Sequence, residues 1–137
     1  MKKQTPVSEI MTKDLVVINK DQSLQEANNI IKNKKIRHVP VTSGEKVVGM
    51  LSKTDLHKIS FINTFDGDEL TTAMYDHLTV EQVMTRELST IKHTDTIHDV
   101  AKILSENEFH ALPVMDGTQI VGIVTTTDLI KYMLQQL

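Results

Sequence analysis

The chain has 137 residues, which suits one compact domain or two small subdomains that share a core. A formal net charge of −3, without a basic stripe interleaved with aromatic residues, argues against nucleic-acid binding, and the lack of cysteine excludes disulfides, thiolate metal sites and cysteine nucleophiles. No apolar run approaches the roughly 18 residues of a membrane span, and no such run follows the N-terminal lysines as in a signal peptide. We therefore expect a soluble, cytoplasmic protein without a membrane partner.

The chain begins with a short apolar-edged segment that is repeated later. Val7, Ile10 and Met11 predict a short helical turn that packs an apolar edge on the core, and residues 80–85 repeat the pattern. Residues 15–18 and 88–91, which follow these turns, are β-prone.

Each β-prone run is followed by an amphipathic helix. Ser23 with Glu26 opens the first helix with a capping-box pattern, and Thr96 with Asp99 opens the second with a weaker version. Apolar residues on one face of each helix are expected to cover a sheet: Leu24, Ala27, Ile30 and Ile31 in the first, and Ile97, Val100, Ile103 and Leu104 in the second.

Two strands follow each helix. Residues 39–41 and 47–51 form the first pair, and residues 112–114 and 120–124 form the second, with a turn expected at Asp116-Gly117. Because proline cannot donate to a ladder, Pro40 and Pro113 are expected at a strand start or on an edge strand.

A second helix follows each strand pair, from Thr54 to about Phe61 and from Thr127 to the C-terminus. Several apolar residues of these helices are expected to face inward: Leu56, Ile59 and Ile62 in the first, and Leu129, Ile130, Met133 and Leu134 in the second. Residues 57–79 form the irregular part of the chain, with a loop around Asp66-Gly67-Asp68 and a further helical turn over 73–78.

The chain thus consists of two copies of one sequence unit in tandem. Residues 49–55 and 122–128 are 122 − 49 = 73 positions apart, and this offset aligns much of the surrounding sequence without a gap. We predict an α/β fold of two β-α-β-β-α repeats that pack about a pseudo-two-fold axis. The boundaries are 1–65 for the first repeat, 66–79 for a connecting segment and 80–137 for the second repeat.

These residues resemble the cystathionine-β-synthase (CBS) domain, in tandem and over nearly the whole chain. The first copy shows Val7-x-x-Ile10-Met11-Thr12, Ser23-Leu24-x-x-Ala27, Val39-Pro40-Val41 and Val47-Val48-Gly49-x-Leu51-Ser52-x-x-Asp55-Leu56. The second shows Val83-Met84-Thr85, Thr96-Ile97-x-x-Val100, Leu112-Pro113-Val114 and Ile120-Val121-Gly122-Ile123-Val124-Thr125-x-x-Asp128-Leu129.

The resemblance implies a stand-alone, bacterial-type CBS pair (a Bateman module) that forms a homodimer and carries out no reaction. Such pairs commonly bind AMP, ADP, ATP or S-adenosylmethionine in clefts between the copies, which here would make a regulatory sensor of cellular energy state. The alternative is a ligand-free module that docks a partner enzyme or transporter. The apolar second helices, including residues 129–137, are the expected dimer surface, unless they are buried within one chain.

Four residues form the expected ribose site: Ser52 with Asp55, and Thr125 with Asp128. Two interpretations stand side by side. As capping boxes, each hydroxyl and carboxylate would bond the backbone amides at the start of a helix. By resemblance, each carboxylate would accept hydrogen bonds from a ribose diol, with the hydroxyl assisting.

Phosphate would need cations from elsewhere, because a carboxylate at a helix N-terminus offsets the positive end of the helix dipole. The resemblance points to Arg37, with His38 beside it, and to His110 as their counterpart. The plainer interpretation is a solvated charge for Arg37 and a hydrogen-bonded surface histidine for His110. Since arginine stays charged and histidine does not, the Arg37 site is expected to bind phosphorylated ligand more tightly.

The resemblance also implies an adenine slot in each cleft. Thr12, Val16 and Ile36 would line one slot, and Thr85, Ser89 and Phe109 the other. Each ribose aspartate is expected to face the slot of the opposite repeat, so that Asp128 works with Val16 and Arg37, and Asp55 with Ser89 and His110. No metal or required cofactor is expected, because none of the six histidines forms an i, i+4 pair, and no catalytic motif is visible.

Overall fold

The computed structural model describes residues 4–62, 75, 77–86 and 89–137, with only the backbone described for 60–62. It divides into two compact units, which we describe one at a time. The first-sheet unit comprises Val16–Leu88, and the second-sheet unit comprises Met1–Leu15 together with Ser89–Leu137.

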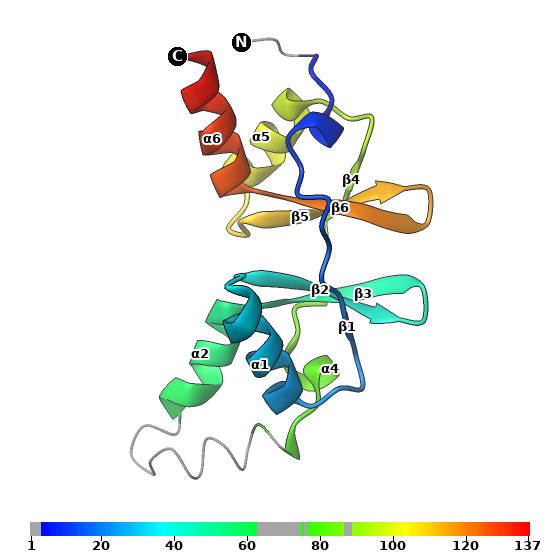
Figure 1. Ribbon diagram of the computed structural model, residues 1–137, viewed down its shortest axis with the longest axis vertical. Helices are drawn as coiled ribbons and strands as arrows, with labels where there is room; N and C mark the ends of the chain where they lie inside the picture. Colours follow the sequence, from blue (N-terminus) through cyan, green and yellow to red (C-terminus); the bar gives the residue numbers. More distant parts are fainter. Residues whose placement is uncertain (1–3, 63–74, 76, 87–88) are drawn as a thin grey trace. The chain divides into compact units, whose positions relative to one another are not determined.

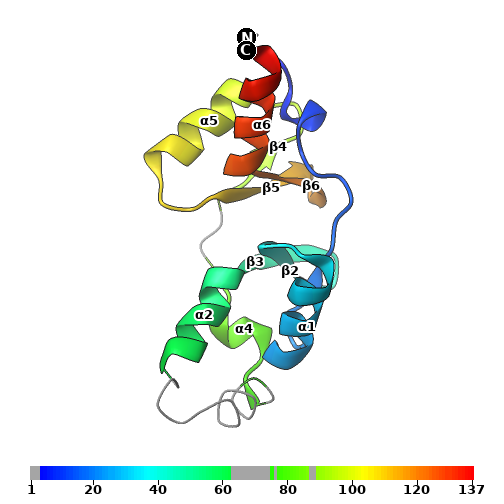
Figure 2. The same ribbon diagram turned by 60° about the vertical axis from the view of Figure 1, so that its left-hand side comes forward.

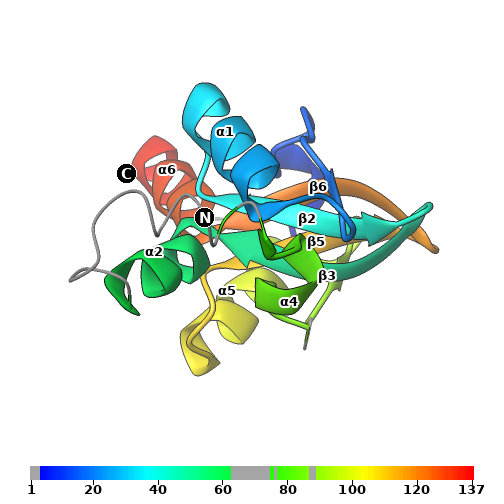
Figure 3. The ribbon, with the colours of Figure 1, turned by 90° about the horizontal axis from the view of Figure 1, so that it is seen from below.

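The first-sheet unit is built on a three-stranded sheet in the order β1-β2-β3. β1 (Ile18–Asn19) pairs in parallel with β2 (His38–Ser43), and β2 pairs antiparallel with β3 (Lys46–Ser52). Three helices, α1 (Leu24–Lys34), α2 (Lys53–Ile62) and α4 (Val80–Val83), lie on one side of this sheet, as Figures 1 and 2 and the view in Figure 3 show.

The second-sheet unit repeats this arrangement. β4 (Ile91–Lys92) pairs in parallel with β5 (Ala111–Asp116), which pairs antiparallel with β6 (Gln119–Thr125). The helices α5 (Ile97–Glu106) and α6 (Thr126–Gln136) and the 3-10 turn η1 (Val7–Glu9) lie on one side of the sheet. The predicted α/β fold with a repeated unit is confirmed, although β1 and β4 keep only the last part of the β-prone runs.

Both hairpins close with a two-residue turn that begins on glycine. Gly44 and Gly117 have φ of +62°, a backbone conformation that glycine adopts without steric cost. Asp116 pairs with Gln119 across the second turn, which confirms the turn predicted at Asp116-Gly117. The predicted strand pairs are likewise confirmed, each extended by one or more residues.

Each short turn at the start of a repeat packs against the sheet of the other repeat. Val7 is buried in the core of the second-sheet unit, where its N–H donates to Asp95 O at 2.8 Å. Val80 is buried in the core of the first-sheet unit, and its N–H donates to Gln22 O at 2.9 Å. The turn that opens the first repeat therefore belongs to the second-sheet unit, and the turn that opens the second repeat belongs to the first-sheet unit. We call these two turns and the residues directly after them the exchanged segments.

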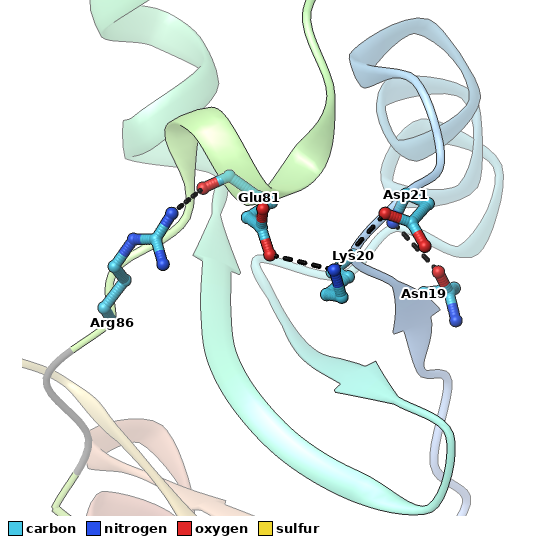
Figure 4. A network of polar contacts seen from close by, with 5 residues as sticks. All are labelled: Asn19, Lys20, Asp21, Glu81 and Arg86. Carbon is cyan, nitrogen blue, oxygen red and sulfur yellow. Dashed lines mark hydrogen bonds and ion pairs between the residues drawn. The ribbon is translucent and has the colours of Figure 1, made fainter.

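A polar network fixes α4 to the loop between β1 and α1 (Figure 4). Lys20 Nζ lies 3.2 Å from Glu81 Oε2 and 3.5 Å from Asp21 Oδ1, and Glu81 N donates to Lys20 O at 3.0 Å. The hydrogen bond to Glu81 and the charge of Asp21 raise the pKa of Lys20 above its usual 10.5. Arg86 Nη2 donates to Glu81 O at 3.3 Å, so the network continues beyond α4.

Two glycines allow the exchanged segments to approach the sheets. A Cβ on Gly122 would lie 2.5 Å from Met11 Sδ and 3.1 Å from Thr12 O. A Cβ on Gly49 would collide in the same way with Met84. Because real Cβ atoms do not approach neighbours this closely, both positions exclude a larger residue without a shift of the methionine or its backbone.

The expectation that the prolines lie at a strand start or on an edge strand is wrong, because Pro40 and Pro113 each occupy the third position of a middle strand. The hydrogen-bonding pattern between β2 and β3 explains why the missing N–H of Pro40 costs little stability. Met50, the partner of Pro40, directs its N–H and C=O to Thr85 instead, at 3.0 and 2.9 Å. Pro40 and Met50 are therefore a non-hydrogen-bonded pair, in which β3 needs no donor from the proline. Ile123 bonds Thr12 in the same way opposite Pro113.

The inward faces of α1 and α5 are confirmed, with Ile30 and Ile103 only partly buried. In α2, Leu56 is buried and Ile59 packs against the same core, whereas the side chain of Ile62 lies outside the described residues. In α6 the prediction is wrong for three residues: Leu129 packs on the core, but Ile130, Met133 and Leu134 are exposed. Burial within one chain therefore does not account for them.

The capping boxes differ from their predicted strengths. Thr96 and Asp99 bond each other's backbone amides at 3.0 and 3.1 Å, a complete box, and this bonding lowers the pKa of Asp99 below 3.8. Ser23 accepts from Glu26 N at 3.1 Å, while the Glu26 carboxylate accepts from Gln22 Nε2 at 3.0 Å. The box predicted to be weaker is thus the more complete one.

Tyr75 is buried in the first-sheet core, and its hydroxyl donates to Leu56 O at 3.0 Å. Tyr75 and His77 are helical, in the predicted turn. The loop predicted around residues 66–68 lies outside the described residues.

Candidate functional site

The first corner, where β3 runs into α2, holds Ser52 and Asp55. Ser52 N donates to Asp55 Oδ2 at 3.0 Å, and Asp55 N donates to Ser52 Oγ at 3.0 Å. Both residues are half-buried. The corner thus orients its carboxylate by a reciprocal cap on the first turn of the helix.

The second corner, where β6 runs into α6, has the same geometry. Thr125 N donates to Asp128 Oδ2 at 2.9 Å, and Asp128 N donates to Thr125 Oγ1 at 3.2 Å. Within the described part of the chain, the other oxygen of each aspartate takes part in no hydrogen bond or ion pair. The capping interpretation is therefore confirmed at both corners, and each cap leaves one oriented oxygen available as an acceptor.

The residues expected to meet phosphate lie beside these corners. Arg37 precedes β2 and is exposed; its carbonyl accepts from Lys53 N at 2.8 Å. His38 pairs with Ser52 in the sheet. His110 holds the equivalent place in the second-sheet unit, where its carbonyl accepts from Thr126 N at 3.0 Å. In each unit the residue expected to meet phosphate thus lies next to the corner of the same repeat.

The residues expected in the adenine slots lie at related places. Thr12 pairs with Ile123 of β6, and Thr85 pairs with Met50 of β3, each through two backbone hydrogen bonds. Ile36 and Phe109 are half-buried and pack on the cores of their own units. Val16 is half-buried and Ser89 is exposed.

Each expected slot draws residues from both compact units. Val16, Ile36 and Arg37 belong to the first-sheet unit, whereas Thr12 and Asp128 belong to the second-sheet unit. For the other slot, Thr85 and Asp55 lie in the first-sheet unit, and Ser89, Phe109 and His110 in the second-sheet unit. The pairing of each aspartate with the slot of the opposite repeat stays a prediction.

Lys53 and Thr126 escaped the sequence reasoning, although each is hydrogen-bonded through its backbone to the residue expected to meet phosphate. The 73-residue offset pairs Lys53 with Thr126 as it pairs Arg37 with His110. The signal in the sequence is a difference between the repeats: a lysine in the first stands where the second has an uncharged threonine.

The described residues contain neither a metal-ligating cluster nor a membrane-spanning helix. No three His, Asp or Glu side chains of the described ranges gather as they would around a metal ion. Among the described helices, none combines the length and apolar character needed to cross a bilayer.

The sequence matches a family model described as the CBS domain twice, over residues 7–61 and 80–135. Protein MJ1225 of Methanocaldococcus jannaschii is 28% identical over 134 residues, which cover 92% of this chain and 46% of that protein. The chain spans less than half the length of the curated relatives that match it first.

Solved structures share the fold. The crystal structure of MJ1225, described as a proposed archaeal homologue of g-AMPK, has a TM-score of 0.83 at 26% identity and covers 97% of this chain and 49% of that one. CBSX2 in complex with AMP gives 0.79 at 26% identity, covering 96% and 98%. The CBS domain pair of MJ0100, in complex with 5′-methylthioadenosine and S-adenosyl-L-methionine, gives 0.80 at 26% identity, covering 97% and 98%.

Proposed function

The chain belongs to the CBS domain family as a tandem pair, and from this membership we propose that it is a regulatory module that binds an adenine nucleotide or an adenosyl ligand and catalyses no reaction. Two structural relatives at 26% identity were solved with AMP and with S-adenosyl-L-methionine. Adenosine is the part that these ligands share. A site for the ribose and adenine is therefore the core of the proposal.

One observation carries this proposal: each corner presents a carboxylate that is oriented by its own backbone and keeps one oxygen available. Oδ2 of Asp128 is held 2.9 Å from Thr125 N, which fixes the plane of the carboxylate. A ribose diol offers two hydroxyl donors, and hydrogen bonds to a charged acceptor are worth roughly 1.5–3 kcal/mol. The same reasoning applies to Asp55 at the first corner.

The test separates binding from capping. Asp128→Asn keeps an amide oxygen that can accept from Thr125 N, so the cap survives, but it replaces the second acceptor with an NH2 donor. We expect Asp128→Asn to bind AMP roughly 10- to 100-fold more weakly in titration calorimetry, with little change in unfolding midpoint. Asp99→Asn is the matched control: it makes the same substitution in the capping box of α5, outside the expected ribose site, and it should leave AMP affinity unchanged. Unchanged AMP affinity in Asp128→Asn would assign Asp128 to capping alone.

Arg37 supports unequal affinity at the two sites. A guanidinium offers a fixed positive charge and a planar set of donors that suits phosphate, whereas the equivalent place in the second-sheet unit holds His110. We propose that the site served by Arg37 binds phosphorylated ligand more tightly, as expected for Asp128, Val16 and Arg37 acting together. Arg37→Ala should weaken AMP binding without changing adenosine binding, and equal AMP affinities for both proteins would contradict this.

A homodimer is the second part of the proposal, and α6 supports it. Ile130, Met133, Leu134 and Leu137 recur at helical spacing and are all exposed, Leu134 to 67%. A second copy that packs on this stripe would remove it from water. Leu134→Lys should convert a dimer to a monomer in sedimentation analysis, whereas Gln135→Lys on the same helix should not. A dimer that survives Leu134→Lys would place the interface elsewhere.

A further inference from the structure

The part of the chain that contains α4 is fastened along the first-sheet unit. It comprises Tyr75 and residues 77–86, and we call it the α4 segment. Leu24 N, at the start of α1, donates to Leu78 O at 2.9 Å, and the side chain of Leu78 packs on the core. The α4 segment is thus an integral part of this unit.

Both ends of the α4 segment contact the chain next to the first corner, residues 52–55. Thr85 exchanges two backbone hydrogen bonds with Met50, at 3.0 and 2.9 Å, two positions before the corner. The hydroxyl of Tyr75 donates to Leu56 O at 3.0 Å, one position after the corner. A single segment therefore holds the first corner from both sides.

The contact between Tyr75 and α2 is shielded from water. Tyr75 is 6% exposed and Leu56 is 2% exposed, and both belong to the same apolar core. A hydrogen bond in such surroundings costs more to break than one at the surface. Leu56 directly follows Asp55 in the first turn of α2, and the reciprocal cap with Ser52 ties the Asp55 carboxylate to that turn. A movement of this turn that breaks the Tyr75 bond therefore also moves the carboxylate.

The second corner has the counterpart of one of these two contacts. Thr12 exchanges two backbone hydrogen bonds with Ile123, two positions before Thr125, as Thr85 does with Met50. The 73-residue offset, however, pairs Tyr75 with a lysine, Lys2, and a charged ammonium does not suit an apolar core. The tyrosine is therefore a property of the first corner and not a requirement of the repeated fold.

We propose that Tyr75 is a positioning residue for the adenosyl site at the first corner, and that occupation of this site and docking of the α4 segment stabilise each other. The docked segment holds Asp55 in place before the ligand arrives, so less conformational freedom is lost on binding. A ribose bound to Asp55 in turn fixes the first turn of α2 and keeps Leu56 O within reach of the Tyr75 hydroxyl. Such coupling is reciprocal by thermodynamic necessity.

This inference rests on the proposed adenosine site and adds the element that responds to its occupation. The α4 segment also carries the network of Lys20, Glu81 and Arg86 (Figure 4), so a change in its docking reaches the polar surface of the first-sheet unit. The ligand-dependent output of this chain is therefore assigned to the α4 segment.

Two backgrounds separate the corners. Asp128→Asn leaves Asp55 as the ribose carboxylate, and Asp55→Asn leaves Asp128. Tyr75→Phe removes the hydroxyl and keeps the ring in the core, while Tyr132→Phe makes the same substitution on α6 and is the matched control. The affinity for AMP and for S-adenosyl-L-methionine would be measured by calorimetry on the full chain, and thermal unfolding would show that each variant is folded.

We expect Tyr75→Phe to weaken ligand binding about two- to tenfold in the Asp128→Asn background, the range for the loss of one hydrogen bond. In the Asp55→Asn background it should leave ligand affinity unchanged. Tyr132→Phe should change affinity in neither background. A hydroxyl with a purely structural role would lower the unfolding midpoint in both backgrounds without this difference in affinity.

Tyrosine fluorescence gives a second readout, because the chain has two tyrosines and no tryptophan. In Tyr132→Phe the emission comes from Tyr75 and reports the surroundings of its hydroxyl. Ligand should change this emission saturably, with the midpoint found by calorimetry, and Asp55→Asn should abolish the change. N-acetyltyrosinamide in the same ligand solutions corrects for light absorbed by adenine.

The possible failures are distinct. If Tyr75→Phe has the same effect in both backgrounds, or a larger one in Asp55→Asn, or if the Tyr75 emission ignores bound ligand, the coupling is overturned and the proposed function stands. If wild type binds neither AMP nor S-adenosyl-L-methionine, the proposed function fails and the coupling fails with it.

Discussion

Gly122→Ala tests how the N-terminal segment is held on the second sheet. The added Cβ would lie 2.5 Å from Met11 Sδ, 2.9 Å from Met11 Cγ and 3.1 Å from Thr12 O. Because the methionine can yield but the Thr12 backbone, bonded to Ile123, yields less easily, we expect a loss of about 2 kcal/mol in the free energy of unfolding, within the range for overpacking. Urea unfolding measures this loss as a lower midpoint at unchanged slope.

A double-mutant cycle makes the reasoning refutable. Met11→Ala removes the side chain that the new methyl group strikes, so Gly122→Ala should cost at least 1 kcal/mol less in the Met11→Ala background. Gly117→Ala is the control, because a Cβ there meets nothing within 4 Å and only the backbone conformation, with φ of +62°, opposes it. Its cost should not depend on Met11. Additivity within about 0.5 kcal/mol for Gly122 and Met11 would refute the close packing.

Three further predictions concern pH and backbone strain. The pKa of Asp99 is lowered chiefly by the hydrogen bond from Thr96 N. The carboxylate therefore contributes its full stabilisation of the fold above pH 3.8, and this contribution is lost as the pH falls through the lower folded value. On acid titration, Asp99→Asn should lose stability less steeply than wild type, and parallel curves would contradict this. The pKa of Lys20 is raised chiefly by its hydrogen bond to Glu81, so its contribution is complete below pH 10.5 and is lost as the pH rises through the folded value. Lys20→Met should remove that alkaline loss of stability, measured by thermal unfolding from about one pH unit below to about one above the usual lysine pKa. Lys35→Gly should raise stability by about 1 kcal/mol in urea unfolding, because glycine relieves the left-handed backbone; an unchanged or lower midpoint would show that Lys35 is not strained.

Local patterns predicted the elements of the fold well. The apolar faces of α1 and α5 and the turn at Asp116-Gly117 follow from spacing and from glycine's backbone freedom. These features depend on residues a few positions apart, which a single sequence displays directly. The tandem repeat then added the second copy of each element.

Features that depend on distant partners could not be read in the same way. Pro40 in a middle strand is tolerated because Met50 bonds Thr85, a residue 45 positions further along the chain than Pro40. The sequence left the place of Leu134 open between the core and a dimer surface, because helical periodicity marks an apolar stripe without saying whether it meets its own core or a second chain. Likewise, the exchange of the segments that hold Val7 and Val80 depends on tertiary packing with residues distant in the sequence.

At the candidate site, the sequence predicted the corners and both of their capping boxes, since Ser-x-x-Asp and Thr-x-x-Asp carry that geometry in their spacing. It did not reveal that Lys53 is bonded to Arg37, because the contact joins a helix start to the residue before another strand.

The most direct test of the central claim is calorimetric titration of the wild-type chain with AMP, ATP and S-adenosylmethionine, repeated on the double variant Asp55→Asn/Asp128→Asn. Both substitutions keep the cap acceptor for Ser52 N and Thr125 N while replacing the carboxylate oxygens that are proposed to accept from the ribose. The account predicts saturable binding of at least one of these ligands to the wild type and its loss from the folded double variant. Equal binding by the two proteins, or no binding by the wild type, would contradict it.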